Sequence, residues 1–255
     1  MARPDPASPT GPASRTDPTS PTVRPVQVRQ NRPARRLPRL LIGAALIAAA
    51  LLYSAWLLSY VLDVNVGTVD GYVSELPALD QPYRWLFAGS DLAAGVLLAA
   101  VGVVMGLATR RAHWLIQAAW WALAVFGLFT VLDVAFPLDC APSVSAACFA
   151  AETNWTVSAA HRIHVVTSVV ANIAVIVHMC AVVRFVRQER RAQAAWPGLG
   201  RAAGPLAALN LVSTLTVLAL VPTGKWVGIP QRVSVLCVAV WLALLGWGLA
   251  KEESG

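Results

Sequence analysis

The sequence predicts an all-α integral membrane protein built as a bundle of six membrane-spanning helices. Of its 255 residues, 57% are hydrophobic and only 13% are charged, and the mean hydropathy is +0.60. This composition is too apolar for an ordinary soluble domain. Six runs are long and apolar enough to cross a bilayer, and arginines stand at the ends of several of them. The net charge of +7 therefore reflects topology. No nucleic-acid motif or aromatic-interleaved basic patch occurs, so we expect no nucleic-acid partner.

Residues 1–36 have a different composition from the rest of the chain. They are rich in Pro, Ser, Thr and Arg and contain few large apolar side chains. Such a segment cannot bury enough surface to offset the entropy lost on ordering. We expect a disordered cytoplasmic tail over residues 1–36 and a membrane domain over residues 37–251.

The predicted spans are bounded by charged residues or proline. The first contains no charge, and most of the others end at a physical signal. They are residues 40–62, 85–109 (before Arg110 and Arg111), 114–134, 159–183 (before Arg184 and Arg187), 203–221 (before Pro222) and 233–250 (before Lys251).

The distribution of basic residues predicts the orientation. Of the 20 lysines and arginines, sixteen fall on the side of the N-terminus when the six spans are threaded through a bilayer. The other four are Arg84, Arg162, Lys225 and Arg232. By the positive-inside rule both termini are cytoplasmic, and we expect a multi-pass protein of the cell membrane.

Two carboxylates lie inside predicted spans. Asp91 falls within the second, and Asp133 lies in the last turn of the third. A carboxylate near mid-bilayer costs roughly 2.5 to 3.5 kcal/mol on insertion scales, so such residues usually face a protein interior or a wet cavity and have a partner. Both residues belong to the outer halves of their spans.

The fourth span opens with His161, Arg162 and His164. Positions i and i+3 share a helix face, so both imidazoles can point into the bundle. We expect these three residues to meet Asp91 and Asp133 in one cavity open to the outer face. The cluster could be a structural network of ion pairs and hydrogen bonds, or a zinc site formed by His161, His164 and Asp91. Zinc is the one cofactor that these residues suggest.

Other residues inside or between the spans have simpler interpretations. Cys140 and Cys148 share an outer loop, eight residues apart, and the oxidising outer compartment favours a disulfide between them. Cys180 and Cys237 lie within spans and are expected to be small core residues. His178 is expected to pack, or to hydrogen-bond across helices.

Several motifs together resemble a known family. They are GYVSELPALDQPYRWLFAGSDLAAG, FTVLDVAFPLDC, Cys148 and SAAHRIHVVTS. The pattern is similar to the domain of unknown function 998 family of small bacterial integral membrane proteins, over about residues 40–250. The matching positions include Glu75, so the resemblance adds this residue to the candidate polar cluster. It implies a multi-span helical fold without a settled activity. A weaker similarity is to intramembrane zinc hydrolases of the ceramidase and progestin-receptor type, which have seven spans.

Three classes of function remain open from the sequence. The first is a non-enzymatic accessory protein, or one that binds a lipid or small molecule in the outer polar cluster. The second is a metal-dependent intramembrane hydrolase acting on lipid. The third is a transporter that uses Asp91, although the inner halves of the second, third and sixth spans hold few polar groups for a path to the cytoplasm. The bilayer is the one partner that the sequence identifies, and the oligomeric state is left open.

Overall fold

The computed structural model describes residues 33–188 and 197–251, and within these ranges six helices are long and apolar enough to span a membrane. The described chain contains no strand. The predicted all-α, six-span architecture is therefore confirmed. The spanning helices are α1 (Pro33–Tyr53), α2 (Arg84–Ala108), α3 (Trp114–Ala135), α5 (Ala159–Gln188), α7 (Pro197–Leu220) and α8 (Gly228–Lys251).

The first span differs in detail from the prediction. Helix α1 begins at Pro33, inside the segment predicted to be a tail, whereas residues 1–32 lie outside the described residues. The span itself, Arg39–Tyr60, lies where it was expected. However, its last part is a 3-10 helix, η1 (Ala55–Tyr60). At the junction Ser54 Oγ donates to the carbonyl of Ala50 at 2.8 Å, and Leu57 N–H donates to the carbonyl of Ser54 at 3.0 Å, which tightens the helix.

The last two spans begin earlier than predicted. Helix α7 begins at Pro197 and is followed at Pro222 by a short 3-10 helix, η3 (Val221–Thr223). Helix α8 begins at Gly228, because Pro230 falls in the first turn, where the missing N–H costs nothing. Arg232 is therefore a buried helix residue. Its guanidinium donates to the carbonyls of Thr68 at 3.0 Å and Gly71 at 2.7 Å.

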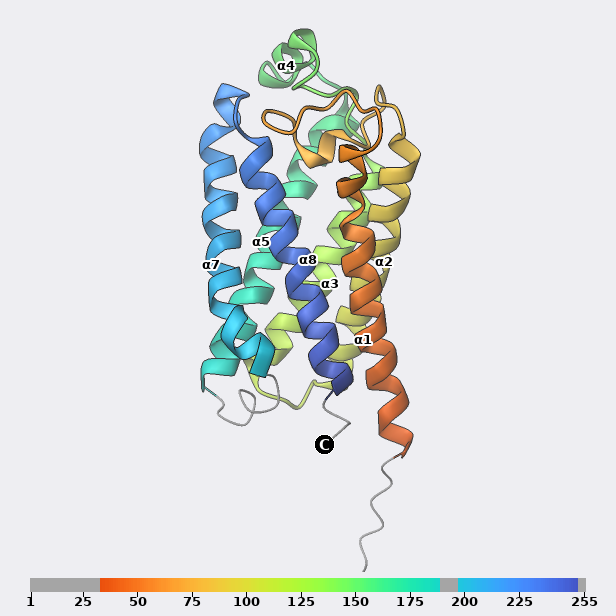
Figure 1. Cartoon of the computed structure of the whole chain (residues 1–255), viewed down its shortest axis with the longest axis vertical. Helices are drawn as coiled ribbons and strands as arrows, with labels where there is room; N and C mark the ends of the chain where they lie inside the picture. The colour runs from red at the N-terminus through yellow and green to blue at the C-terminus, as the bar shows by residue number, and fades with distance from the viewer. Residues whose placement is uncertain (1–32, 189–196, 252–255) are drawn as a thin grey trace, which may run out of the picture. The chain divides into compact units, whose positions relative to one another are not determined.

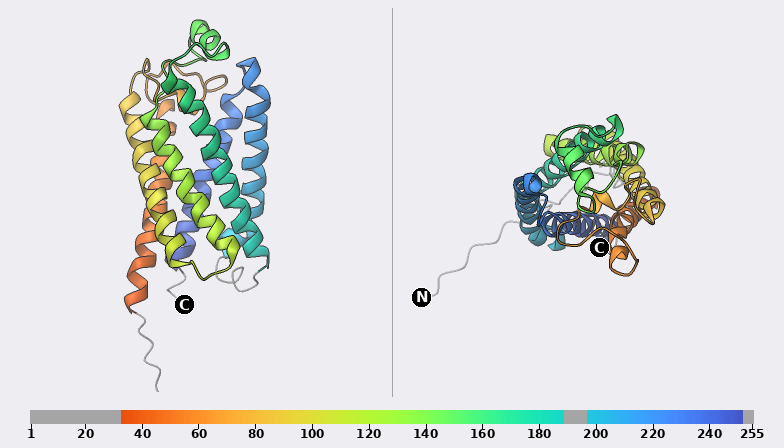
Figure 2. Two further views of the ribbon diagram at one scale, coloured as in Figure 1. Left: turned by 180° about the vertical axis from the view of Figure 1, so that it is seen from behind. Right: turned by 90° about the horizontal axis from the view of Figure 1, so that it is seen from above.

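The six spans form a closed ring in chain order (Figure 2). Each span packs against the spans before and after it in the chain, and α8 closes the ring on α1. Glycines permit the closest approaches. A Cβ at Gly102 of α2 would lie 2.4 Å from the Ala124 nitrogen of α3, and a Cβ at Gly43 of α1 would lie 2.6 Å from the Gly246 carbonyl oxygen of α8. Small residues are the usual means of helix association in lipid, where no hydrophobic force drives helices together.

His178 links three helices at the centre of the ring. Its ring is completely buried, with Nδ1 at 2.9 Å from the carbonyl of Ala119 on α3. On the other side, Trp241 of α8 donates its indole N–H to Nε2 at 3.0 Å. The expected cross-helix hydrogen bonding of His178 is confirmed.

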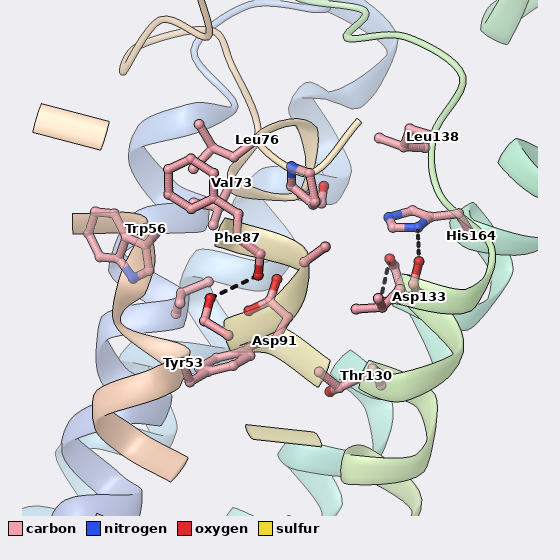
Figure 3. A pocket seen from close by; sticks show the side chains of 18 of the residues that line it. Tyr53, Trp56, Val73, Leu76, Phe87, Asp91, Thr130, Asp133, Leu138 and His164 are labelled. Atoms are coloured by element: carbon pink, nitrogen blue, oxygen red, sulfur yellow. Dashed lines mark hydrogen bonds between the residues drawn. The ribbon is translucent and has the colours of Figure 1, made fainter. Parts of the chain in front are cut away.

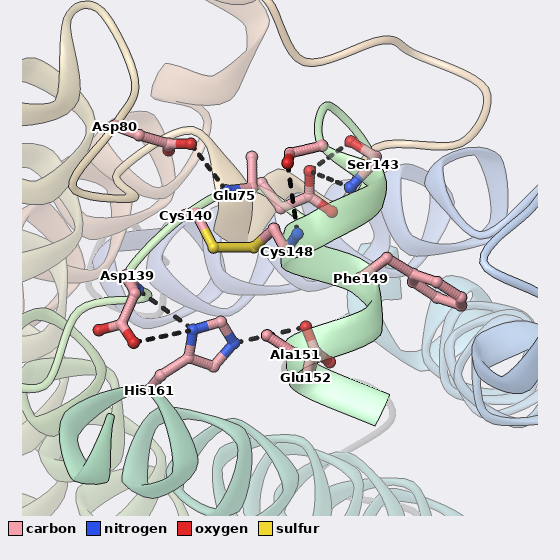
Figure 4. Close-up of a disulfide and its surroundings, with 12 residues drawn as sticks. Glu75, Asp80, Asp139, Cys140, Ser143, Cys148, Phe149, Ala151, Glu152 and His161 are labelled. Carbon is pink, nitrogen blue, oxygen red and sulfur yellow. Dashed lines mark hydrogen bonds and ion pairs between the residues drawn. A yellow bond between two sulfur atoms is a disulfide. The ribbon is translucent and has the colours of Figure 1, made fainter. Parts of the chain in front are cut away.

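Two loops form a layer over one end of the ring (Figure 1). We call this layer, residues 61–83 and 136–158, the cap. It contains the 3-10 helix η2 (Val73–Glu75), the helix α4 (Ala146–Thr153) and the predicted Cys140–Cys148 disulfide, which joins Cα atoms 6.1 Å apart (Figure 4). Helix α4 was not predicted. Ser145 begins it by accepting a hydrogen bond from the N–H of Cys148 at 3.3 Å.

Candidate functional site

A cavity of about 140 Å³ lies inside the ring at its cap end (Figure 3). Asp91, Asp133 and His164 all line it. Asp91 lies in the second turn of α2, Asp133 in the last turn of α3 and His164 in the second turn of α5. Because neighbouring spans run antiparallel, these positions come to a similar depth. The structure thus brings together three of the predicted site residues.

The Asp133 carboxylate is fully engaged by α5. One oxygen accepts a hydrogen bond from the Thr167 hydroxyl, and the other accepts from Ser168 Oγ at 3.0 Å. These bonds join α3 to α5 and give hydrogen-bond partners to one of the two carboxylates that lie within the spans. Asp133 therefore contributes more to holding the cavity wall than to offering a free binding group.

His164 has one satisfied ring nitrogen and one that is open. Its Nδ1 lies 3.0 Å from the carbonyl oxygens of both Asp133 and Phe136. Carbonyls only accept, so Nδ1 carries the proton, and in the neutral ring Nε2 is then an acceptor. His164 is only 5% exposed, so water does not replace the missing partner, and this Nε2 is buried without a hydrogen bond in the described structure. The ring faces the cavity (Figure 3).

The Asp91 carboxylate also lacks a partner. Among the described residues it makes no hydrogen bond and no ion pair. Arg84 lines the same cavity, but its guanidinium lies over the Trp85 ring, 4.0 Å from the ring centroid. The cavity therefore presents two open acceptors, one from α2 and one from α5, that can receive hydrogen bonds or a positive charge. It also presents two unpaired donors, Nε of Arg84 and Nε1 of Trp56.

The predicted single cluster is corrected by the structure into separate groups. His161 lies against the cap (Figure 4), where its Nδ1 accepts from the N–H of Asp139 at 3.1 Å and its Nε2 faces Glu152 at 3.4 Å. Arg162 is exposed and does not line the cavity. The reason is depth: His161 lies one helical turn nearer the cap than His164, and Arg162 points away from both because successive helix residues are about 100° apart.

The same separation affects the predicted zinc ligands. His164 and Asp91 line the cavity, whereas the ring of His161 is held between Asp139 and Glu152. Over residues 33–188 and 197–251, no three His, Cys, Asp or Glu side chains gather closely enough to hold one metal ion. Of the three predicted zinc ligands, the structure thus brings together His164 and Asp91 and places His161 against the cap.

Glu75 belongs to the cap and joins its two loops. The side chain is 0% exposed. Its carboxylate accepts hydrogen bonds from the N–H of Tyr72 at 3.3 Å and from both the N–H, at 3.3 Å, and the hydroxyl of Ser143. Burial raises the pKa of Glu75 to about 7, against the opposing effect of these hydrogen bonds. Glu75 thus lies outside the cavity.

Comparison with known families places the chain. The model of a family described as protein of unknown function (DUF998) matches residues 46–248. The chain belongs to the DUF998 family. The match extends from α1 to α8 and confirms the resemblance inferred from the motifs. No curated protein and no solved structure matches the chain.

The DUF998 protein has a second hollow beside the first. A groove of about 360 Å³ lies between α5, α7 and α8. It adjoins the central cavity, because the two share the lining residues Ser74, Leu138, His164, Ser168, Asn172, Gln231 and Ser234. Ser168 and Asn172 extend the polar face of the fourth span that begins with His161 and His164.

Sequence reasoning missed several polar residues that line the hollows of this DUF998 protein, among them Gln231 and Ser234. Gln231 and Ser234 line both hollows from the first two turns of α8. Gln231 was missed because the sixth span was predicted to begin only at residue 233, whereas Ser234 lay inside that span without a second polar residue beside it. Their spacing of three residues, which puts both on one helix face, was the signal that could have identified them.

Proposed function

We propose that this DUF998 protein is a non-enzymatic membrane protein that binds a lipid or small molecule through a polar group held in the central cavity. The observation that supports this is the pair of open acceptors, Asp91 and His164 Nε2, in one buried cavity. A buried polar atom without a hydrogen bond costs free energy, and a carboxylate without a partner costs more. A ligand that donates hydrogen bonds would remove both costs.

The acceptors also indicate the chemistry of the ligand. An ionised Asp91 attracts an ammonium group, and Nε2 of His164 accepts from an N–H or O–H. A carboxylate in the same place would face repulsion from Asp91. The ligand group is therefore an amine or a hydroxyl. The positive-inside bias favours an outer position for the cap, and with it the cavity; on that side of the cell membrane the protein would act as an accessory factor.

Thermal unfolding in nanodiscs of phosphatidylcholine tests this function. Decylamine, decanol and decanoate have chains of equal length and differ in their polar head group, which is an amine, a hydroxyl or a carboxylate. A ligand that binds the folded state raises the melting temperature. We expect the largest rise with decylamine, a smaller one with decanol and none with decanoate.

A pair of carboxylate variants provides the control. Asp91→Asn should abolish the advantage of decylamine over decanol, because the amide carries no charge. Asp63→Asn removes an exposed carboxylate in the cap and should leave that advantage intact. Equal shifts with all three amphiphiles, or no difference between the two variants, would refute the proposed function.

A further inference from the structure

The groove between α5, α7 and α8 is apolar along its two long walls. Val169, Ile173 and Ile176 line it from α5, whereas Leu215, Leu218 and Val221 line it from α7 and its end. Several of these side chains are strongly exposed on helices that span the bilayer: Ile173 is 57% exposed and Leu215 is 55% exposed. The groove therefore faces the hydrocarbon of the membrane.

Polar groups line the inner side of the same groove. Ser168, Asn172, Thr214, Gln231 and Ser234 lie along it and lead to His164. Some of them are bonded within the chain, since Ser234 Oγ donates to Asn210 at 2.8 Å. Nε2 of His164 remains open at the place where groove and cavity meet. The hollow as a whole is thus amphipathic, with an apolar outer part and a polar end.

The length of the groove fits one leaflet. Ile176 follows His164 by twelve residues on α5, which corresponds to about 18 Å along a helix. Half of a hydrocarbon core is roughly 15 Å thick. A chain that lies in this groove with its polar group at His164 would extend from the cap-side interface to about the middle of the bilayer.

We propose that the groove holds the hydrocarbon chain of a membrane lipid from the cap-side leaflet, and that the amine or hydroxyl head of this lipid lies in the central cavity against Asp91 and His164. The inference rests on the proposed function and adds to it the class of ligand and its route of entry. A lipid can enter sideways between α5 and α7 without leaving the bilayer, and a second chain can stay in the surrounding lipid.

Photo-crosslinking with an alkylamine that carries a mid-chain diazirine tests where the chain lies. The full-length protein in phosphatidylcholine nanodiscs is irradiated, digested and examined by mass spectrometry, with decylamine as competitor. We expect labelled peptides to include residues 169–176 of α5 and 214–221 of α7, with decylamine reducing the label. Competed label confined to other helices would overturn the inference.

Groove-filling variants supply a second, independent measurement. Leu215→Trp should weaken decylamine binding by about tenfold, because the indole occupies space that the chain needs. The matched control is Val212→Trp, which alters a residue on the same helix that is 60% exposed and does not line the groove. If Leu215→Trp does not fold, Ile173→Trp fills the groove from α5.

The outcomes separate the inference from the proposed function. If decylamine binding depends on Asp91 but is unaffected by Leu215→Trp and Ile173→Trp, the cavity binds a polar ligand and the groove inference is wrong. If decylamine binding does not depend on Asp91, the proposed function itself fails.

Discussion

Among individual residues, the buried polar groups differ in whether their hydrogen bonds are completed within the chain. His178 uses both ring nitrogens between α3 and α8, and Asp133 uses both carboxylate oxygens on α5. By contrast, Asp91 and Nε2 of His164 face the cavity without partners among the described residues. Completed groups fix the positions of helices. Open groups retain a capacity for binding, so the central cavity, rather than the cap, is the candidate binding site.

Glu75 predicts a pH dependence of stability. Its pKa is raised by burial to about 7 in the folded protein, above the ordinary value of 4.5. The folded state therefore holds the proton more tightly than the unfolded state, and stability falls as the pH rises from about 4.5 through 7. The loss is on the order of 3 kcal/mol. Glu75→Gln removes the titrating group, so its melting temperature relative to wild type should be higher at pH 8 than at pH 5.

A matched variant controls for the loss of a carboxylate in general. Asp63 is exposed in the same loop of the cap, and Asp63→Asn should change the melting temperature by a similar small amount at both pH values. A difference between Glu75→Gln and wild type that is the same at pH 5 and pH 8 would show that Glu75 ionises without cost.

Some of the site residues could be predicted because the free-energy cost of a carboxylate in the bilayer can be recognised from the sequence alone. A carboxylate in an apolar run requires an interior position, so Asp91 and Asp133 could be assigned to the bundle. The separation of His161 from His164 could not be predicted in the same way. Both lie on one helix face, and the depth at which the cap meets α5 depends on Asp139 and Glu152, which belong to the cap loop and not to the pattern of α5.

Among the helices, the contact between α2 and α3 predicts that two glycine-to-alanine substitutions on α2 change stability in opposite directions. An added Cβ at Gly102 would lie 2.4 Å from the backbone nitrogen of Ala124, whereas a Cβ at Gly89 of the same helix would meet nothing within 4 Å. Gly102→Ala should therefore lower the free energy of unfolding by about 1 to 3 kcal/mol through overpacking. Gly89→Ala should leave it unchanged or raise it by roughly 0.5 to 1 kcal/mol, because alanine favours helix.

Thermal melting of the two variants in the same detergent measures this difference. Because both substitutions add one methyl group to α2, a change in hydrophobicity cannot explain opposite signs. Equal melting temperatures for Gly102→Ala and Gly89→Ala would mean that α2 and α3 can separate without cost, contrary to the packing described above.

Helix positions followed from the sequence more closely than helix ends. Apolar runs identify spans because the bilayer demands about 20 apolar residues. The ends depend on contacts that a run does not reveal. Arg232 belongs to α8 because loop carbonyls at Thr68 and Gly71 accept hydrogen bonds from its guanidinium, and α4, which contains Cys148, begins where Ser145 caps it.

For the whole molecule, the ring arrangement connects the sequence order to the position of the site. Each span packs against the spans before and after it in the chain, and successive spans run in opposite directions. The long loops gather at one end as the cap, and the short turn between α2 and α3 lies at the other (Figure 1). The cavity therefore opens towards whichever side of the membrane the cap occupies.

The distribution of basic residues predicts which side that is. Within the described ranges most lysines and arginines lie at the end opposite the cap, so we expect the cap outside and both termini in the cytoplasm.

Cysteine labelling in intact cells can measure this orientation, in a background where Cys180 and Cys237 are replaced by alanine and the Cys140–Cys148 disulfide is retained. Lys225→Cys, at the cap end, should react with a membrane-impermeant maleimide. Ala112→Cys, in the exposed α2–α3 turn, should react only after the cells are opened. Labelling of position 112 from outside would reverse the topology and place the cavity on the cytoplasmic side, where its ligand would have to come from the inner leaflet.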